Sequence, residues 1–180
     1  MLKPATAAVR NLARLMPLGP GTPEMSLQNA LTQLKPDDLF TAPVRRLDFA
    51  QACLSGLWLW NDFLDESHRI SQDLSGIDGS YWHAFMHRRE LDFGNSKYWL
   101  RRVGNHPIFP TLAAAARILA DDAPGPARFL GDHGSWDPFA FVDLCERAVR
   151  EGGEVEMLCR RIQKAEWELL FEHDAREAVG

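Results

Sequence analysis

The apolar residues of this 180-residue chain recur at helical spacing along most of its length. The clearest stretch is LDFAQACLSGLWLWNDFLDE, residues 47–66, which lacks proline and shows no strand-like alternation of apolar and polar positions. Its apolar residues cover well over half of a helical circumference, whereas Asp62 and Glu66 belong to its one polar stripe. We therefore predict a central helix over about 47–66 that is buried on nearly every side.

Shorter helices are predicted on both sides of this central helix, with proline and glycine residues at the connections. The sequence shows no internal repeat and no convincing pair of strands. The pattern predicts an all-α fold, a single-domain irregular helical bundle over residues 1–180, in which residues 1–25 could form a loosely packed N-terminal segment. The other predicted helices cover residues 4–16, 26–34, 80–90, 94–103, 111–120, 138–151 and 154–175, with a loop over 121–135.

Composition agrees with a globular protein of ordinary size. Hydrophobic residues make up 46% and charged residues 25% of the chain, and both values are near the averages for soluble domains. No run approaches the roughly 18 uninterrupted apolar residues of a membrane span. Cys53, Cys145 and Cys159 are odd in number and lie far apart, which is typical of reduced core residues. We expect a cytoplasmic protein without a membrane partner.

The unusual chemistry of the chain is concentrated in GSYWHAFMHRRELDFGNSKYWLRRVGNHP, residues 79–107. This segment carries a net charge of +3, although the whole chain has a formal net charge of −5. A local basic patch on an acidic protein favours a small anionic ligand over nucleic acid, which is normally bound by a basic domain.

Two segments of the chain resemble a known group of sequences. SGLWLWNDFLDESHRISQ, residues 55–72, and YWHAFMHRRELDFGNSKYWLRRVGNHP, residues 81–107, are similar to segments of a family of uncharacterised bacterial and fungal proteins. The match covers about a quarter of the chain. The resemblance implies membership of that family, but no activity, cofactor or functional residue.

The residues most suited to metal binding are the histidines of the second segment. His83 and His87 are four residues apart, so their rings share one face of a helix, and Glu90 joins them one turn later. Two imidazoles and a carboxylate could bind zinc, iron or manganese, and His68 is a further candidate ligand. Without a metal, the two histidines could instead serve as acid and base.

Two acids of the central helix could complete such a site. Asp62 or Glu66 would act as the partner of His83 and His87, because polar groups on a mostly buried helix need partners. Trp82, Phe85 and Met86 share a different face of their helix, and we expect them in the core.

Basic and aromatic residues next to the histidines could hold an anion. Guanidinium groups bind phosphate and carboxylate in bidentate fashion. The alternative is that the arginines pair with the acids of the central helix or complement helix dipoles. The candidate anion-binding residues are Arg88, Arg89, Lys97, Tyr98, Arg101 and Arg102.

Three functional hypotheses follow from these residues. The first is an enzyme acting on a small phosphate- or carboxylate-bearing substrate, with or without a metal ion. The second is a non-catalytic module that binds a ligand or polyanion. The third is a buried network of histidine, arginine and acidic side chains with a structural role. The sequence leaves all three open.

Overall fold

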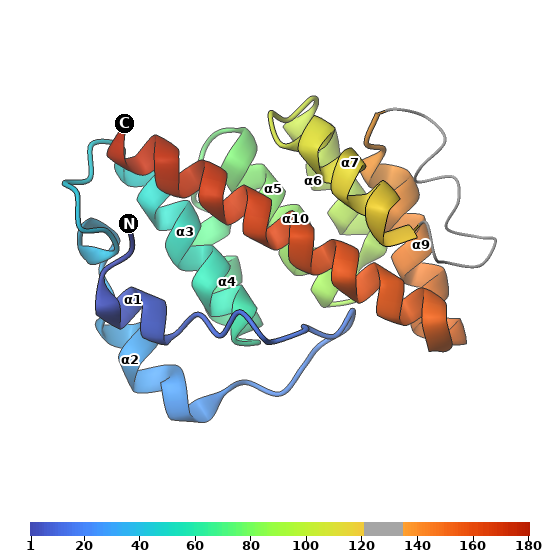
Figure 1. Ribbon diagram of the computed structural model, residues 1–180, viewed down its shortest axis with the longest axis horizontal. Helices are drawn as coiled ribbons and strands as arrows, with labels where there is room; N and C mark the ends of the chain where they lie inside the picture. Colours follow the sequence, from blue (N-terminus) through green and yellow to red (C-terminus); the bar gives the residue numbers. More distant parts are fainter. Residues whose placement is uncertain (121–134) are drawn as a thin grey trace.

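The structure is a computed structural model that describes residues 1–120 and 135–180; the predicted loop over 121–135 lies outside these residues except for its last position. The described residues contain nine α-helices and no β-strand, which confirms the predicted all-α bundle (Figure 1). The helices are α1 (Pro4–Ala8), α2 (Gln28–Gln33), α3 (Leu47–Trp60), α4 (Leu64–Ser71), α5 (Ile77–Arg89), α6 (Phe93–Val103), α7 (Phe109–Ala120), α9 (Pro138–Glu151) and α10 (Gly153–Val179). Two short 3₁₀ helices cover Met25–Leu27 and Pro36–Asp38.

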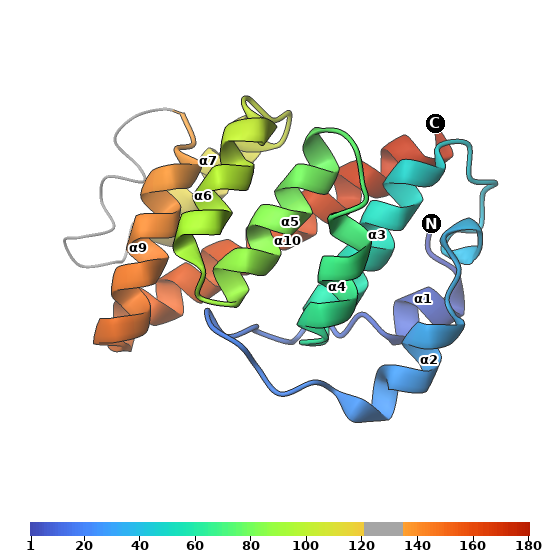
Figure 2. The same ribbon diagram turned by 180° about the vertical axis from the view of Figure 1, so that it is seen from behind.

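The helices form a row that is crossed by the long C-terminal helix. Helices α3, α4, α5, α6 and α9 each contact the next (Figure 2), and α10 lies diagonally across them and contacts α3, α7 and α9 (Figure 1). Among the described helices, none is both long and apolar enough to cross a membrane.

The core between these layers is built around three tryptophans. The ring of Trp167 on α10 lies 4.4 Å from that of Trp60 and 5.9 Å from that of Trp82, measured between centroids. Gly56 allows this packing, because a Cβ atom there would lie 2.7 Å from the Trp82 ring. Phe85, like Trp82 and Met86, is fully buried, as predicted.

The prediction of one central helix over 47–66 is wrong in its extent. Helix α3 ends at Trp60, and a second helix, α4, begins at Leu64. Asp62, in the break, has a left-handed backbone with φ of 64°. Its buried carboxylate pairs with Arg89 at 2.5 Å and with Arg14. These ion pairs stabilise a conformation that no glycine or proline signals in the sequence, and the break allows α4 to pack beside α5.

The predicted helix over 4–16 is also too long, because α1 ends at Ala8. The chain that follows runs along α10 in an irregular conformation (Figure 1). Arg160 of α10 donates hydrogen bonds to the carbonyls of Leu15 and Met16 at 2.7 and 3.0 Å. Side chains of the bundle thereby bind carbonyls that a helix would have used internally.

The two helices that contain most of residues 79–107 also begin at other residues than predicted. Helix α5 begins at Ile77, because Gly76 with φ of 107° makes the preceding turn. Helix α6 is capped by Asp92, whose side chain accepts a hydrogen bond from the Asn95 backbone at 3.0 Å. Helix α9 is capped by Asp137, whose side chain accepts hydrogen bonds from the backbone N–H groups of Phe139 and Ala140.

Candidate metal centre

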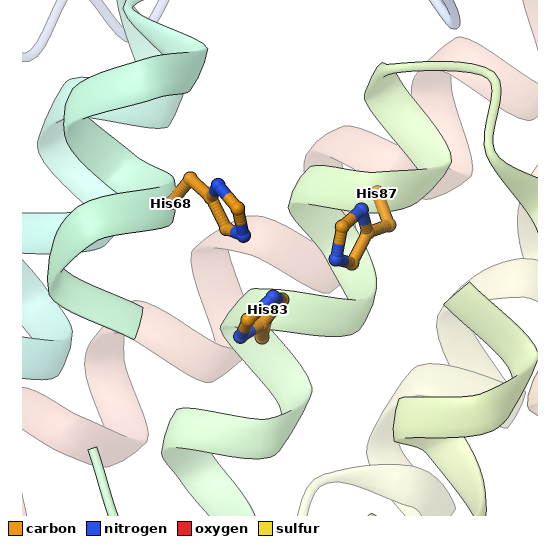
Figure 3. Close-up of side chains that lie close together, drawn as sticks. All are labelled: His68, His83 and His87. Atoms are coloured by element: carbon orange, nitrogen blue, oxygen red, sulfur yellow. The ribbon is translucent and has the colours of Figure 1, made fainter. Parts of the chain in front are cut away.

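Three histidines from two helices converge in the space between α4 and α5. His68 lies on α4, and His83 and His87 lie one turn apart on α5 (Figure 3). One ligand atom from each ring lies within 4.8 Å of the other two. His83 and His87 are only 3% and 5% exposed as whole residues, whereas His68 is half-buried. The break between α3 and α4 thus adds a third imidazole to the pair that the sequence spacing predicts.

Burial keeps the two α5 histidines neutral. It lowers the pKa of His83 to about 4, with smaller contributions from His87 and His68. Burial also lowers the pKa of His87, although the hydrogen bond and charge of Glu90 act in the opposite direction. Near neutral pH both rings therefore offer a nitrogen lone pair, which is the form that binds a metal ion.

Hydrogen bonds fix which nitrogen of His87 offers its lone pair. Nδ1 lies 3.0 Å from Oε2 of Glu90, so the network assigns the ring proton to Nδ1. Nε2 then accepts a hydrogen bond of 3.0 Å from the side-chain amide of Asn95, which a metal ion bound at Nε2 would replace. Sequence analysis did not identify Asn95 as a partner of His87. Its role in this network depends on the packing of α6 against α5.

The ring of His83 is held between its neighbours without a full set of hydrogen bonds. Among the described residues, its buried Nδ1 has no hydrogen-bond partner. The ring stacks on Trp99 at 4.1 Å between centroids, and the Arg102 guanidinium lies 4.9 Å from the Trp99 ring. A buried nitrogen without a hydrogen-bond partner lowers the free energy of unfolding, and metal coordination would offset this loss.

The candidate acids take other positions. Glu90 contacts His87 and is not part of the three-histidine group. Asp62 is bound to Arg89 and Arg14, and together with Glu66 it lines a separate cavity of about 330 Å³. The structure therefore does not bring Asp62 or Glu66 to the histidines.

The two arginines at the end of α5 form ion pairs with buried acids. Arg88 pairs with Glu166 on α10, and Tyr81 donates a hydrogen bond of 2.9 Å to the same carboxylate. Arg89 pairs with Asp62. Sequence reasoning missed Glu166 as the partner of Arg88, because it lies on α10, far from Arg88 in the chain.

The basic residues of α6 are more accessible than those of α5. Lys97 pairs with Asp143 at the surface. Arg101 and Arg102 are exposed, and within the described ranges neither makes an ion pair. Tyr98 is 51% exposed. Of the candidate anion-binding residues, those on α6 could therefore reach a ligand.

Comparisons with protein-family models, with curated proteins and with solved structures found no match for this chain. The similarity of residues 55–72 and 81–107 to uncharacterised bacterial and fungal proteins stays a prediction.

Proposed function

We propose that this protein is an enzyme that uses a divalent transition metal ion, bound by His68, His83 and His87, to act on a small anionic substrate. The convergence of three imidazoles from α4 and α5 carries the proposal. Three protein ligands leave a coordination position for water, which is typical of catalytic zinc sites. The metal ion would lower the pKa of that water and make it a nucleophile near neutral pH.

The donor set favours zinc or iron over manganese. Glu90 is engaged with Nδ1 of His87, which leaves three imidazole nitrogens as the ligands. Imidazole suits zinc and iron, whereas manganese prefers carboxylate and water oxygens. Glu90 would then orient His87, as carboxylates commonly do for metal-bound histidines.

The exposed arginines of α6 support an anionic substrate. Arg102 lies over the Trp99 ring, and Trp99 stacks on His83, so a cationic group lies one aromatic side chain away from a proposed metal ligand. Guanidinium groups bind phosphate or carboxylate in a defined orientation. An anion held by Arg102 could be placed with its reacting atom near the metal-bound water.

One observation favours a structural role for part of the segment. Arg88 and Arg89 are buried and occupied by Glu166 and Asp62, so they fit the buried network of the third hypothesis. The histidines lie outside these ion pairs. The proposal therefore assigns stability to the α5 arginines and chemistry to the histidines.

Metal binding by matched variants tests the first half of the proposal. We expect the metal-stripped protein to bind one Zn²⁺, and Co²⁺ in its place to give the visible absorption of a four-coordinate site. His68→Gln, His83→Gln and His87→Gln should each weaken binding by more than the roughly ten- to hundredfold typical of outer-shell partners. The control is His173→Gln, because His173 lies outside the group. Equal loss in the control, or no bound metal in the unaltered protein, would contradict the proposal.

Hydrolysis of 4-nitrophenyl phosphate tests catalysis separately. The Zn²⁺-loaded protein should release 4-nitrophenolate, His83→Gln should abolish this activity, and Arg102→Met should raise the KM more than it lowers the kcat. Metal binding without turnover of this or a carboxylate ester would support the non-catalytic binding module instead.

A further inference from the structure

A second group of titratable side chains lies at the other end of α5. Oδ1 of Asp78, in the first turn of α5, accepts a hydrogen bond from Nε2 of His106 at 3.0 Å, and Nε2 of His173 lies 3.3 Å from the same atom. His106 precedes α7 and is buried, whereas His173 on α10 is half-buried. Sequence reasoning gave neither histidine a role.

The hydrogen bonds of His106 make it a donor and not a metal ligand. The backbone N–H of Ile108 points to Nδ1 of His106 at 3.3 Å, so Nδ1 is the acceptor and the proton lies on Nε2. That proton is donated to Asp78. His87 has the opposite arrangement, because its Nδ1 faces the carboxylate of Glu90. The second group is therefore unsuited to a metal ion, although its geometry resembles the first.

A buried acid beneath Asp78 completes this network. Asp174 accepts a hydrogen bond of 2.6 Å from Nε1 of Trp82. Burial, followed by the charge of Asp78, raises the pKa of Asp174 well above its usual value, which favours the protonated form of Asp174 as a hydrogen-bond donor to Asp78. Burial would raise the pKa of Asp78 too, but hydrogen bonds from His106 and Asp174 outweigh it, and the pKa is lowered. Asp78 is thus the ionised member.

His173 is the member of the network that a ligand could reach. Because Nε2 faces the carboxylate of Asp78, we assign the ring proton to Nε2, which leaves the lone pair on Nδ1. Burial lowers the pKa of His173, which favours this neutral form. His173 and Asp78 line a cavity of about 430 Å³, whose wall also includes the apolar residues Phe49, Leu74, Ile77 and Pro107.

The charges of the cavity select the type of ligand. Its described lining includes the acids Asp48, Asp78 and Glu177, and Arg46 as the one basic residue. The Arg46 guanidinium is itself held by Glu177 at 2.7 Å and lies 3.9 Å from the Phe49 ring centroid. The wall therefore has a net negative charge and an acceptor nitrogen, which favour a cationic hydrogen-bond donor over an anion.

We propose that this cavity is a second binding site, which takes a small amine with an apolar body. The ammonium group donates to Nδ1 of His173 within the negative field of the acids, and the body packs against Leu74 and Ile77. None of the lining residues belongs to the three-histidine group. The site is therefore independent of the proposed metal centre.

The test compares three probes of similar size, benzylamine, benzyl alcohol and benzoate, titrated into the full chain and followed by the backbone amide signals of Gly76, Ile77 and Gly79. We expect saturable shifts with benzylamine, weaker ones with benzyl alcohol and none with benzoate. His173→Gln should weaken benzylamine binding about tenfold, the equivalent of one good hydrogen bond. Glu177→Gln, at a half-buried position, should weaken it several-fold and leave benzyl alcohol binding unchanged.

The matched control is His68→Gln, which removes a proposed metal ligand and should leave benzylamine binding unchanged. Benzoate binding as tightly as benzylamine would overturn the proposal. So would unchanged affinity in both the His173 and Glu177 variants. Because the titration needs no metal ion, its result is separate from that of the metal-binding experiment.

Discussion

Nδ1 of His87 lies 3.0 Å from Oε2 of Glu90, and this contact leaves Nε2 as the lone-pair nitrogen of the ring. Sequence spacing alone suggests Glu90 as a metal ligand, whereas in the structure Glu90 contacts a proposed ligand, His87. In the proposed metal centre Glu90 positions His87 and does not touch the ion.

Glu90→Ala should weaken Zn²⁺ binding by about ten- to hundredfold, as is typical when a carboxylate behind a metal-bound histidine is lost. Glu90→Gln should retain most of the affinity, because its amide oxygen can still accept a hydrogen bond from Nδ1 of His87. Competition against a chromophoric chelator measures both. Glu154→Ala, an exposed change on α10, is the control. Equal affinity of Glu90→Ala and the unaltered protein would remove the positioning role.

Arg88→Met should lower the free energy of unfolding by about 3–5 kcal/mol, because it leaves the buried carboxylate of Glu166 without its cation. The two side chains are 2% and 1% exposed. Adding Glu166→Gln should restore much of the loss, since glutamine needs no counter-ion and can still accept from Tyr81.

Urea denaturation measures these differences, and the matched control is Arg150→Met. Arg150 pairs with Glu146 on the exposed face of α9, where such pairs contribute about 0.3–0.5 kcal/mol. Similar losses for Arg88→Met and Arg150→Met would show that the buried pair is not special.

Gly21→Ala should destabilise the fold by about 1–3 kcal/mol, because the added Cβ atom would overlap the carboxylate of Asp62. That carboxylate cannot move away, since Arg89 and Arg14 hold it. Gly94→Ala is the control: its Cβ atom would lie 3.8 Å from the nearest atom, Asp92 Oδ1, and should stabilise α6 by about 0.5–1 kcal/mol. Thermal unfolding of both variants measures these changes in stability. An unchanged melting temperature for Gly21→Ala would mean that the N-terminal segment shifts freely.

Asp174→Asn should become more stable relative to the unaltered protein as the pH rises from about 5 to about 8. The pKa of Asp174 is raised in the fold, so its contribution is fully present below the unfolded value of about 3.9 and is lost as the pH rises through the native pKa. Asparagine does not titrate and can still accept from Trp82.

Urea midpoints at both pH values measure this difference. Asp174→Ala should be destabilised at either pH, because it leaves Nε1 of Trp82 buried without an acceptor. A difference between Asp174→Asn and the unaltered protein that does not change with pH would argue against a protonated Asp174.

Local patterns predicted the helical elements but not their ends. Residues 47–60 are helical as expected, and all of them except Leu47, Asp48 and Gln51 are buried, because a long apolar stretch with little polar surface leaves few alternatives. The break at Asp62 depends on Arg89, 27 residues later, and on Arg14. Helix propensity contains no information about such distant partners.

The sequence by itself determined an all-helical chain, the burial of Trp82, Phe85 and Met86, and the shared face of His83 and His87, because helical periodicity is a local property. Only the tertiary structure decided that His68 joins this pair and that Glu166 forms an ion pair with Arg88. It also decided that His106 and His173 meet at Asp78. These contacts join residues far apart in the chain, whose proximity depends on how whole helices pack.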